Sequence, residues 1–226
     1  MANYTTFKAV KQKTEGFLSR NPQDTGGMTW KGIARKFHPN WPGFVIIDFE
    51  VLKNPSLSDK ALSNILRSNS YLEELVDDFY RPIWNRIGAN NFSQDLANLY
   101  MDWYIHKPAD AVRAMQRILN AHFGEKLSVD GAPGNFTNSA VKRNDSPKLY
   151  NLLREERIKD YTSKSSSSPT FYQAWINRVK WHFPKKSVVV DSSKYVLWGA
   201  GILATSFLIY KTVPGEQRKE GSEAVN

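Results

Sequence analysis

Three side chains that could take part in acid-base chemistry lie close together near the N-terminus: Glu15, Asp24 and Thr29. Glu15 ends an amphipathic run and is followed by Gly16, so we expect a helix that ends at Glu15. A carboxylate there faces the negative end of the helix dipole, and neighbouring aromatic rings would desolvate it, so both effects raise its pKa. A carboxylic acid that is still protonated near neutral pH can protonate the leaving oxygen of a glycoside. The competing interpretation is a surface glutamate beside a turn.

The residues after Glu15 are rich in turn signals. Asn21-Pro22, Gly26-Gly27 and Gly32 predict tight turns within a small β-hairpin that carries Asp24 and Thr29. Across a cleft from Glu15, either of these two side chains could hold or activate the attacking water.

The stretch from Thr14 to Ala34 resembles the signature of glycoside hydrolase family 108, the lysozyme-like muramidases once described as secretion activators. Members show a Glu-Gly-Gly, an Asp-x-Gly-Gly-x-Thr and a Gly-Ile-Thr, which correspond here to elements that begin at Glu15, Asp24 and Gly32. Phe17 stands in place of the usual second Gly, and Ala34 in place of the usual Thr.

This resemblance implies a mainly helical, lysozyme-like α+β fold with a small β-hairpin by the active site. It implies an N-acetylmuramidase that cleaves the β-1,4 bond between N-acetylmuramic acid and N-acetylglucosamine. Glu15 would be the general acid, with Asp24 and Thr29 supporting it or positioning water. An inverting, a retaining or an anhydro-sugar outcome stays open at this point.

Several further residues are expected to contact the glycan strand. They are Gly26, Gly27, Trp30, Trp41, Asp102 and Gln116. Trp41 lies in a Pro-rich and Gly-rich loop and could stack on a sugar, although a structural Trp in a turn is an equal alternative. Asp102 and Gln116 match positions that are typical of the family, whose resemblance extends from about Phe7 to Phe183.

Residues 129–137 predict a turn that leads into a helix. Asp130-Gly131 and Thr137 resemble the Asp-Gly-x-x-Gly-x-x-Thr of predicted peptidoglycan-binding segments. The glycines permit positive φ, and Asn135 or Thr137 can cap the helix that follows. A structural turn without a ligand is the alternative.

Helical periodicity continues through most of the chain, with a kink expected at Pro82. Residues 44–49 are rich in β-forming side chains, but the family resemblance favours a helix there. The acidic cluster at 73–78 is interpreted as a solvated face. We therefore expect a catalytic lobe at 1–94, a helical peptidoglycan-binding lobe at 95–184, a linker at 185–194, a transmembrane helix at 195–213 and a polar tail at 214–226.

The C-terminal segment is the most apolar part of the chain. Residues 195–210 carry no charge and are bracketed by Lys194 and Lys211. As a helix they would measure about 24 Å, and the aromatic residues near both ends are typical of a membrane belt. A buried core helix is the alternative. Gly201 and Thr205 offer a small face for helix self-association.

The N-terminus carries no apolar signal segment, so we expect a single-pass protein of the inner membrane. Its catalytic domain would start in the cytoplasm and act on the periplasmic wall after a membrane lesion, as suits a phage or prophage lysis enzyme.

Composition excludes some chemistry. The 226 residues include no cysteine, which removes disulfides and thiolate metal sites, and the four histidines are scattered. We expect no metal and no cofactor. The net charge of +9 suits an anionic wall or lipid, and no recognition motif indicates nucleic acid. Two rival functions remain: a non-catalytic peptidoglycan-binding protein, and a membrane-permeabilising lysis protein.

Overall fold

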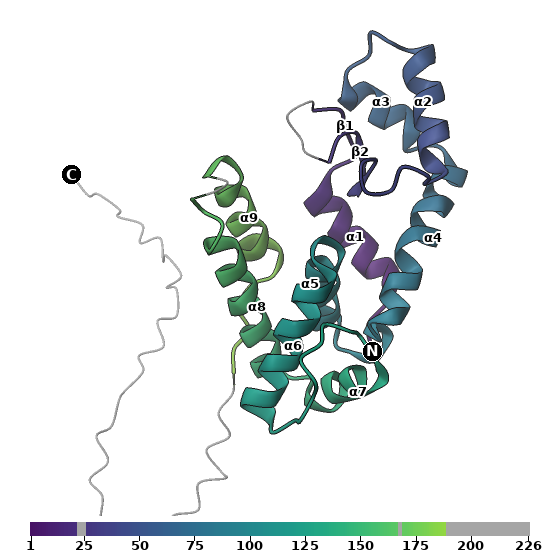
Figure 1. Ribbon diagram of the computed structural model, residues 1–226. Helices are drawn as coiled ribbons and strands as arrows, with labels where there is room; N and C mark the ends of the chain where they lie inside the picture. The colour runs from purple at the N-terminus through teal and green to yellow at the C-terminus, as the bar shows by residue number, and fades with distance from the viewer. Residues whose placement is uncertain (22–25, 167–168, 189–226) are drawn as a thin grey trace, which may run out of the picture. The chain divides into compact units, whose positions relative to one another are not determined.

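Helices dominate the part of the chain that the computed structural model describes, namely residues 1–21, 26–166 and 169–188 (Figure 1). The side chains of residues 13–15 and 169–171 are not described. The helices are α1 (Tyr4–Glu15), α2 (Gly43–Lys53), α3 (Asp59–Leu66), α4 (Ser70–Arg86), α5 (Gln94–His106), α6 (Pro108–Phe123), α7 (Asn135–Asn144), α8 (Pro147–Thr162) and α9 (Pro169–His182), with a short 3-10 helix, η1 (Ala89–Asn91), before α5. The predicted mainly helical class is confirmed.

The limits of α1 follow from its flanking residues. The side chain of Asn3 accepts a hydrogen bond from the backbone N–H of Thr5 at 2.7 Å and caps the first turn. At the other end, Gly16 adopts φ 68°, a conformation that glycine takes without steric cost. The helix therefore ends at Glu15, as predicted.

The apolar run after Pro42 forms helix α2, as the family resemblance favoured over its β-forming composition. Phe44 and Ile47, three residues apart, are buried, whereas Val45 and Phe49 on the other side are exposed. The run therefore packs along one face only, and that face follows helical spacing.

A small antiparallel sheet lies beside the end of α1. Its strands are β1 (Leu18–Ser19), β2 (Thr29–Trp30) and β3 (Ile33–Ala34), in the order β1-β2-β3. Lys31 and Gly32, with φ of 46° and 82°, form a two-residue turn with both residues left-handed. This is the geometry that matches the twist of a hairpin. The predicted hairpin is confirmed, and β1 adds a third strand to it.

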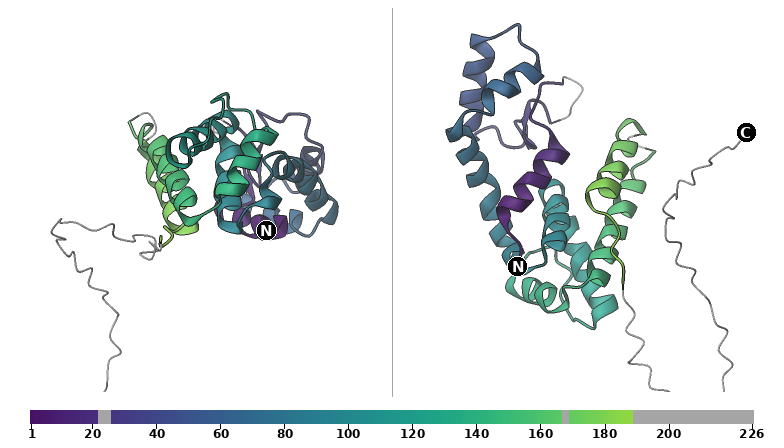
Figure 2. Two further views of the ribbon diagram at one scale, coloured as in Figure 1. Left: turned by 90° about the horizontal axis from the view of Figure 1, so that it is seen from below. Right: turned by 180° about the vertical axis from the view of Figure 1, so that it is seen from behind.

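Helix α5 is the centre of the described unit, which spans residues 1–188. All residues from Leu96 to Tyr104 are buried, as expected of a helix covered on every side. It contacts α1 and α4, which carry the sheet, and also α6 and α8 (Figures 1 and 2). The part of the chain around the sheet is thus joined to the C-terminal helices through one shared helix.

The C-terminal predictions fall partly outside the described residues. Lys186 donates its backbone N–H to Asn151 on α8 at 2.9 Å, so the start of the expected 185–194 linker is packed. The expected transmembrane helix at 195–213 and tail at 214–226 lie outside the described residues. Among the described helices, none combines the length and apolar character needed to span a bilayer.

Candidate active site

The end of α1 brings Glu15 to the small sheet. Gly16 turns the chain, and the carbonyl of Phe17 then accepts the backbone N–H of Lys31 at 3.0 Å. The backbone of Glu15 thus lies two residues from the first contact with the hairpin. The side chain of Glu15 and the whole of Asp24 lie outside the described residues, so their predicted roles stay predictions.

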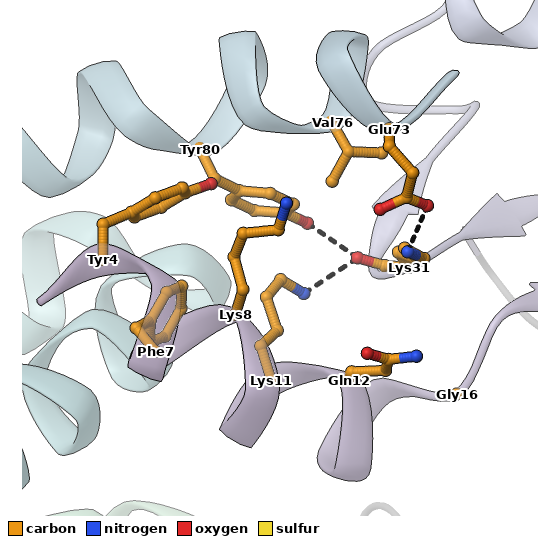
Figure 3. Close-up of a pocket in the computed structure, with 10 residues that line it drawn as sticks. All are labelled: Tyr4, Phe7, Lys8, Lys11, Gln12, Gly16, Lys31, Glu73, Val76 and Tyr80. Atoms are coloured by element: carbon orange, nitrogen blue, oxygen red, sulfur yellow. Dashed lines mark hydrogen bonds and ion pairs between the residues drawn. The ribbon is translucent and has the colours of Figure 1, made fainter. Parts of the chain in front are cut away.

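The hairpin turn is held between α1 and α4. The backbone carbonyl of Lys31 accepts hydrogen bonds from Lys11 Nζ at 2.8 Å and from the Tyr80 hydroxyl at 3.0 Å (Figure 3). Lys31 Nζ forms an ion pair with Glu73 on α4. A non-glycine residue at positive φ costs about 1 to 2 kcal/mol, and these contacts offset that cost.

Strand β1 is anchored from the other side, by α3. The backbone N–H of Leu18 donates to Ser63 Oγ at 3.1 Å, and that of Arg20 donates to the Asp59 carboxylate at 2.7 Å. The Arg20 guanidinium also pairs with Asp59. The segment that follows Glu15 is therefore fixed at both its strand and its turn.

A small hollow opens between α1, α4 and the hairpin, next to Gly16 (Figure 3). Its volume of about 40 Å³ has room for roughly one water molecule. Lys8 on its wall pairs with Asp77 at 2.7 Å. Burial raises the pKa of Tyr4, and nearby Asp77 raises it further, so the phenol stays protonated and donates to Asp77.

The acidic cluster on α4 is therefore not only a solvated face, and that prediction was wrong for two of its members. Glu73 and Asp77 pair with Lys31 and Lys8, which come from the hairpin and from α1. These pairs join elements far apart in the sequence, so helical periodicity alone did not reveal them.

The glycines and the threonine of the signature shape the turn before β2. Thr29 Oγ1 donates to the carbonyl of Gly27 at 3.2 Å, and Gly27 itself has φ 69°. Gly26 is buried, and its carbonyl accepts the backbone N–H of Lys36 at 3.2 Å. Thr29 is half-buried and makes this local hydrogen bond. Its role in positioning a water molecule stays a prediction.

Both tryptophans predicted to contact sugar lie in the core. Trp30 is 0% exposed and packs near Phe17, with ring centroids 6.1 Å apart. Trp41 is 8% exposed, lies edge-on to Phe44 and donates its indole N–H to the carbonyl of Leu75 at 3.3 Å. In this structure neither offers an open ring face to a sugar, and their predicted contacts with the glycan strand stay predictions.

Asp102 and Gln116, also expected at the substrate, are buried as well. Asp102 on α5 forms an ion pair with Arg178 on α9 at 2.6 Å. Gln116 on α6 donates to Asp130 at 2.8 Å and to Thr137 Oγ1 at 3.1 Å, and accepts the N–H of Gly131. Each side chain fixes one element to another, and residue type alone does not distinguish this role from contact with a substrate.

The turn at residues 129–137 is thus built around the buried side-chain amide of Gln116. The backbone N–H of Ala132 and the amide of Gln116 both donate to Asp130, and these bonds hold the pKa of that carboxyl below its ordinary value. Phe136 beside it is 87% exposed. The predicted turn leading into helix α7 is confirmed, and no finding tests whether it binds the wall.

Two glycines of this turn are expected to respond differently to replacement by alanine. Gly131 has φ 81°, and an added Cβ would lie 3.1 Å from the carbonyl oxygen of Ala109. We expect Gly131→Ala to lower the free energy of unfolding by about 1 to 3 kcal/mol. Thermal denaturation of the full chain measures this loss.

The matched control is Gly134→Ala. Gly134 has φ −100°, and its Cβ would meet nothing within 4 Å. We expect a change within about 0.5 kcal/mol there. Equal melting temperatures for the two variants would contradict the assigned role of Gly131.

Sequence reasoning missed the residues that hold the hairpin, chiefly Lys11 and Lys31. A signal for Lys11 was present: it follows Phe7 by four residues and so shares the apolar face of α1, where a charge needs a buried partner. For Lys31, the hint was its place before Gly32 in a two-residue turn.

The region that holds the candidate site also matches a known family of proteins. The family model described as Glycosyl hydrolase 108 matches residues 9–107, from within α1 to the residue that links α5 and α6. Residues 9–107 are thus similar to this glycoside hydrolase family. A second model, described as a predicted peptidoglycan domain, matches residues 110–180. The two matches meet between α5 and α6, and the predicted division into lobes at 94/95 stays a prediction.

The chain is also similar to a solved structure titled Structure of Brucella abortus SagA. It is 22% identical, has a TM-score of 0.52, and the match covers 80% of this chain and 92% of that one. The likeness shows a shared fold. No curated protein matches the chain.

Proposed function

We propose that this chain belongs to glycoside hydrolase family 108 and is an N-acetylmuramidase that cleaves the β-1,4 bond between N-acetylmuramic acid and N-acetylglucosamine. One observation carries the proposal: the backbone of Glu15 ends α1 directly beside a hairpin that is fixed to three helices. A general acid needs a fixed position relative to the bond that it protonates, and rigid supporting elements provide it.

In the proposed reaction, the Glu15 carboxylic acid gives its proton to the leaving glycosidic oxygen as the bond lengthens. The sugar left behind acquires oxocarbenium character, and water attacks its anomeric carbon. Asp24 or Thr29 positions that water. The Lys11 and Tyr80 hydrogen bonds to the Lys31 carbonyl hold the hairpin turn against α1 and α4.

The products of digestion test this reaction. Purified peptidoglycan treated with the enzyme is expected to release muropeptides with a reducing N-acetylmuramic acid end, because water is the acceptor. Mass spectrometry of the products before and after borohydride reduction measures this. Anhydro-muramic ends alone would assign the enzyme to the lytic transglycosylases, and free peptides with intact glycan would refute glycosidase action.

For location, we propose that residues 195–213 anchor the protein in the inner membrane of a phage-infected or lysogenic cell, with the enzyme part initially cytoplasmic. Five cations at positions 178, 180, 185, 186 and 194 precede the uncharged run 195–210 and three follow it, which favours this orientation. In intact spheroplasts, added protease should leave the enzyme part uncut until the membrane is permeabilised. Recovery of the protein in the soluble fraction would contradict the anchor.

A further inference from the structure

A second hollow, of about 370 Å³, lies between α6 and α8 next to Trp103 of α5. Helix α6 lines it with Asp110, Arg113 and Arg117, which follow one another at intervals of three and four residues and so share a face. Helix α8 contributes Glu156, Lys159 and Asp160. The hollow lies wholly among the residues matched as hydrolase and peptidoglycan domains, and its size suits a small ligand.

The negative charges of this hollow are already matched. Asp160 pairs with Arg157 at 3.2 Å and with Lys107 at 3.4 Å, and it accepts a hydrogen bond from Lys164. Burial raises the pKa of Asp160, but these cations outweigh burial and leave the pKa below its ordinary value. Glu156 pairs with Lys159 at 2.7 Å. The third carboxylate, Asp110, lies 3.9 Å from Lys107 and 3.7 Å from Arg113, so each carboxylate of the hollow has a cation nearby.

The donors, in contrast, are left over. Within the described residues Arg117 has no ion pair, and Arg113 has only the distant Asp110 carboxylate at 3.7 Å. The indole N–H of Trp103 is buried, and no acceptor for it occurs in the part of the chain that the structure describes. Because this N–H is covered, the groups that a ligand in the hollow can reach are the side chains of Arg113 and Arg117.

Guanidinium groups without a close ion pair select a carboxylate, which their paired N–H groups bind in a fixed geometry. A neutral sugar usually packs on an open aromatic face, but Trp103 is only 3% exposed and the rest of the hollow is lined by charged and hydroxyl side chains. Peptidoglycan carries carboxylates on its peptide stems. We propose that this hollow binds the free carboxylate of a peptide stem, with Arg113 and Arg117 as its principal contacts.

This inference rests on the proposed function, because it takes peptidoglycan as the substrate. It would give the enzyme a second hold on the strand that it cuts, on the peptide and not on the sugar. Contact with the stem at α6 and α8 would favour wall that still carries its peptides over bare glycan.

Binding to the full chain carrying Glu15→Gln, which prevents cutting, tests the proposal. The probes are a disaccharide-tripeptide with free carboxylates, the same compound with its peptide carboxylates amidated, and the peptide-free disaccharide with its lactyl carboxylate. We expect the free tripeptide to bind about tenfold more tightly than either of the others, and to shift the indole proton resonance assigned to Trp103.

Two charge-removing variants sharpen the test. Arg117→Met should weaken binding of the tripeptide by about tenfold. Lys142→Met removes one cation from an exposed position on α7 outside the hollow and should leave binding unchanged. Equal weakening by both variants would mean that net charge, not this hollow, attracts the stem, and the proposal would fall.

The outcomes for the inference and for the proposed function are separable. If the peptide-free disaccharide or the amidated probe binds as tightly as the free tripeptide, the hollow does not read a stem carboxylate. That result would overturn the inference even if the unmutated enzyme releases reducing muramic ends from peptidoglycan. Conversely, the tripeptide could bind selectively while the unmutated enzyme releases no muropeptides from peptidoglycan. That result would support the carboxylate site and refute the muramidase.

Discussion

Replacing Glu15 by Gln is expected to slow peptidoglycan hydrolysis by about 10²- to 10⁴-fold, because the amide cannot donate the proton that the leaving oxygen needs. The fold should survive, since Glu15 is the last residue of α1 and the turn after it depends on Gly16. The rate at which a peptidoglycan suspension clears measures the loss, and an unchanged melting temperature shows that the variant is folded.

Three other substitutions provide comparisons for the expected loss of activity in Glu15→Gln. Asp24→Asn and Thr29→Ala should each cost less than Glu15→Gln, because these residues support the water and do not donate the proton. Glu155→Gln makes the same chemical change at an exposed position on α8 and should clear peptidoglycan at the normal rate. Near-normal activity of Glu15→Gln would show that another group is the acid.

The second large effect is expected on stability, at the ion pair between Asp102 and Arg178. The Arg178 guanidinium donates to Asp102 Oδ1 through Nη2 at 2.6 Å and through Nε at 3.1 Å. The side chain of Asp102 is 6% exposed and that of Arg178 is 14% exposed. Asp102→Asn would remove the carboxylate charge that pairs with a largely buried guanidinium, so we expect a loss of about 3 to 5 kcal/mol of unfolding free energy.

For a unit of this size that loss corresponds to a fall in melting temperature of about 6 to 20 °C. Scanning calorimetry of the full chain measures it. Glu155→Gln serves again as the control, because Glu155 pairs with Lys185 at 3.4 Å at the surface and should contribute less than about 1 kcal/mol. Similar losses in the two variants would mean that the buried pair contributes no more than an exposed one.

A double replacement separates charge from packing. Asp102→Leu combined with Arg178→Met removes both charges together and should recover part of the stability lost in Asp102→Asn. The pair also joins the two family matches, since Asp102 lies in the hydrolase part and Arg178 in the peptidoglycan part.

The sequence by itself determined the features that local chemistry controls. Gly16 stops α1 at Glu15 because glycine takes a positive φ without steric cost, and the Lys31-Gly32 pair closes a hairpin for a related reason. The family signature between Thr14 and Ala34 then indicated which reaction such a helix end could support. These inferences needed only neighbours in the chain, so they did not depend on how distant elements pack.

Only the tertiary structure decided which polar and aromatic side chains face the interior. Trp30 and Asp102 have residue types that suit either a sugar site or a buried contact, and only the packing of distant elements selects between them. Lys11 reaches Lys31 twenty positions away, and Arg178 reaches Asp102 across 76 positions. Such pairs form because packing places a buried charge beside the partner that compensates its desolvation, and no local spacing rule in the sequence encodes that distance.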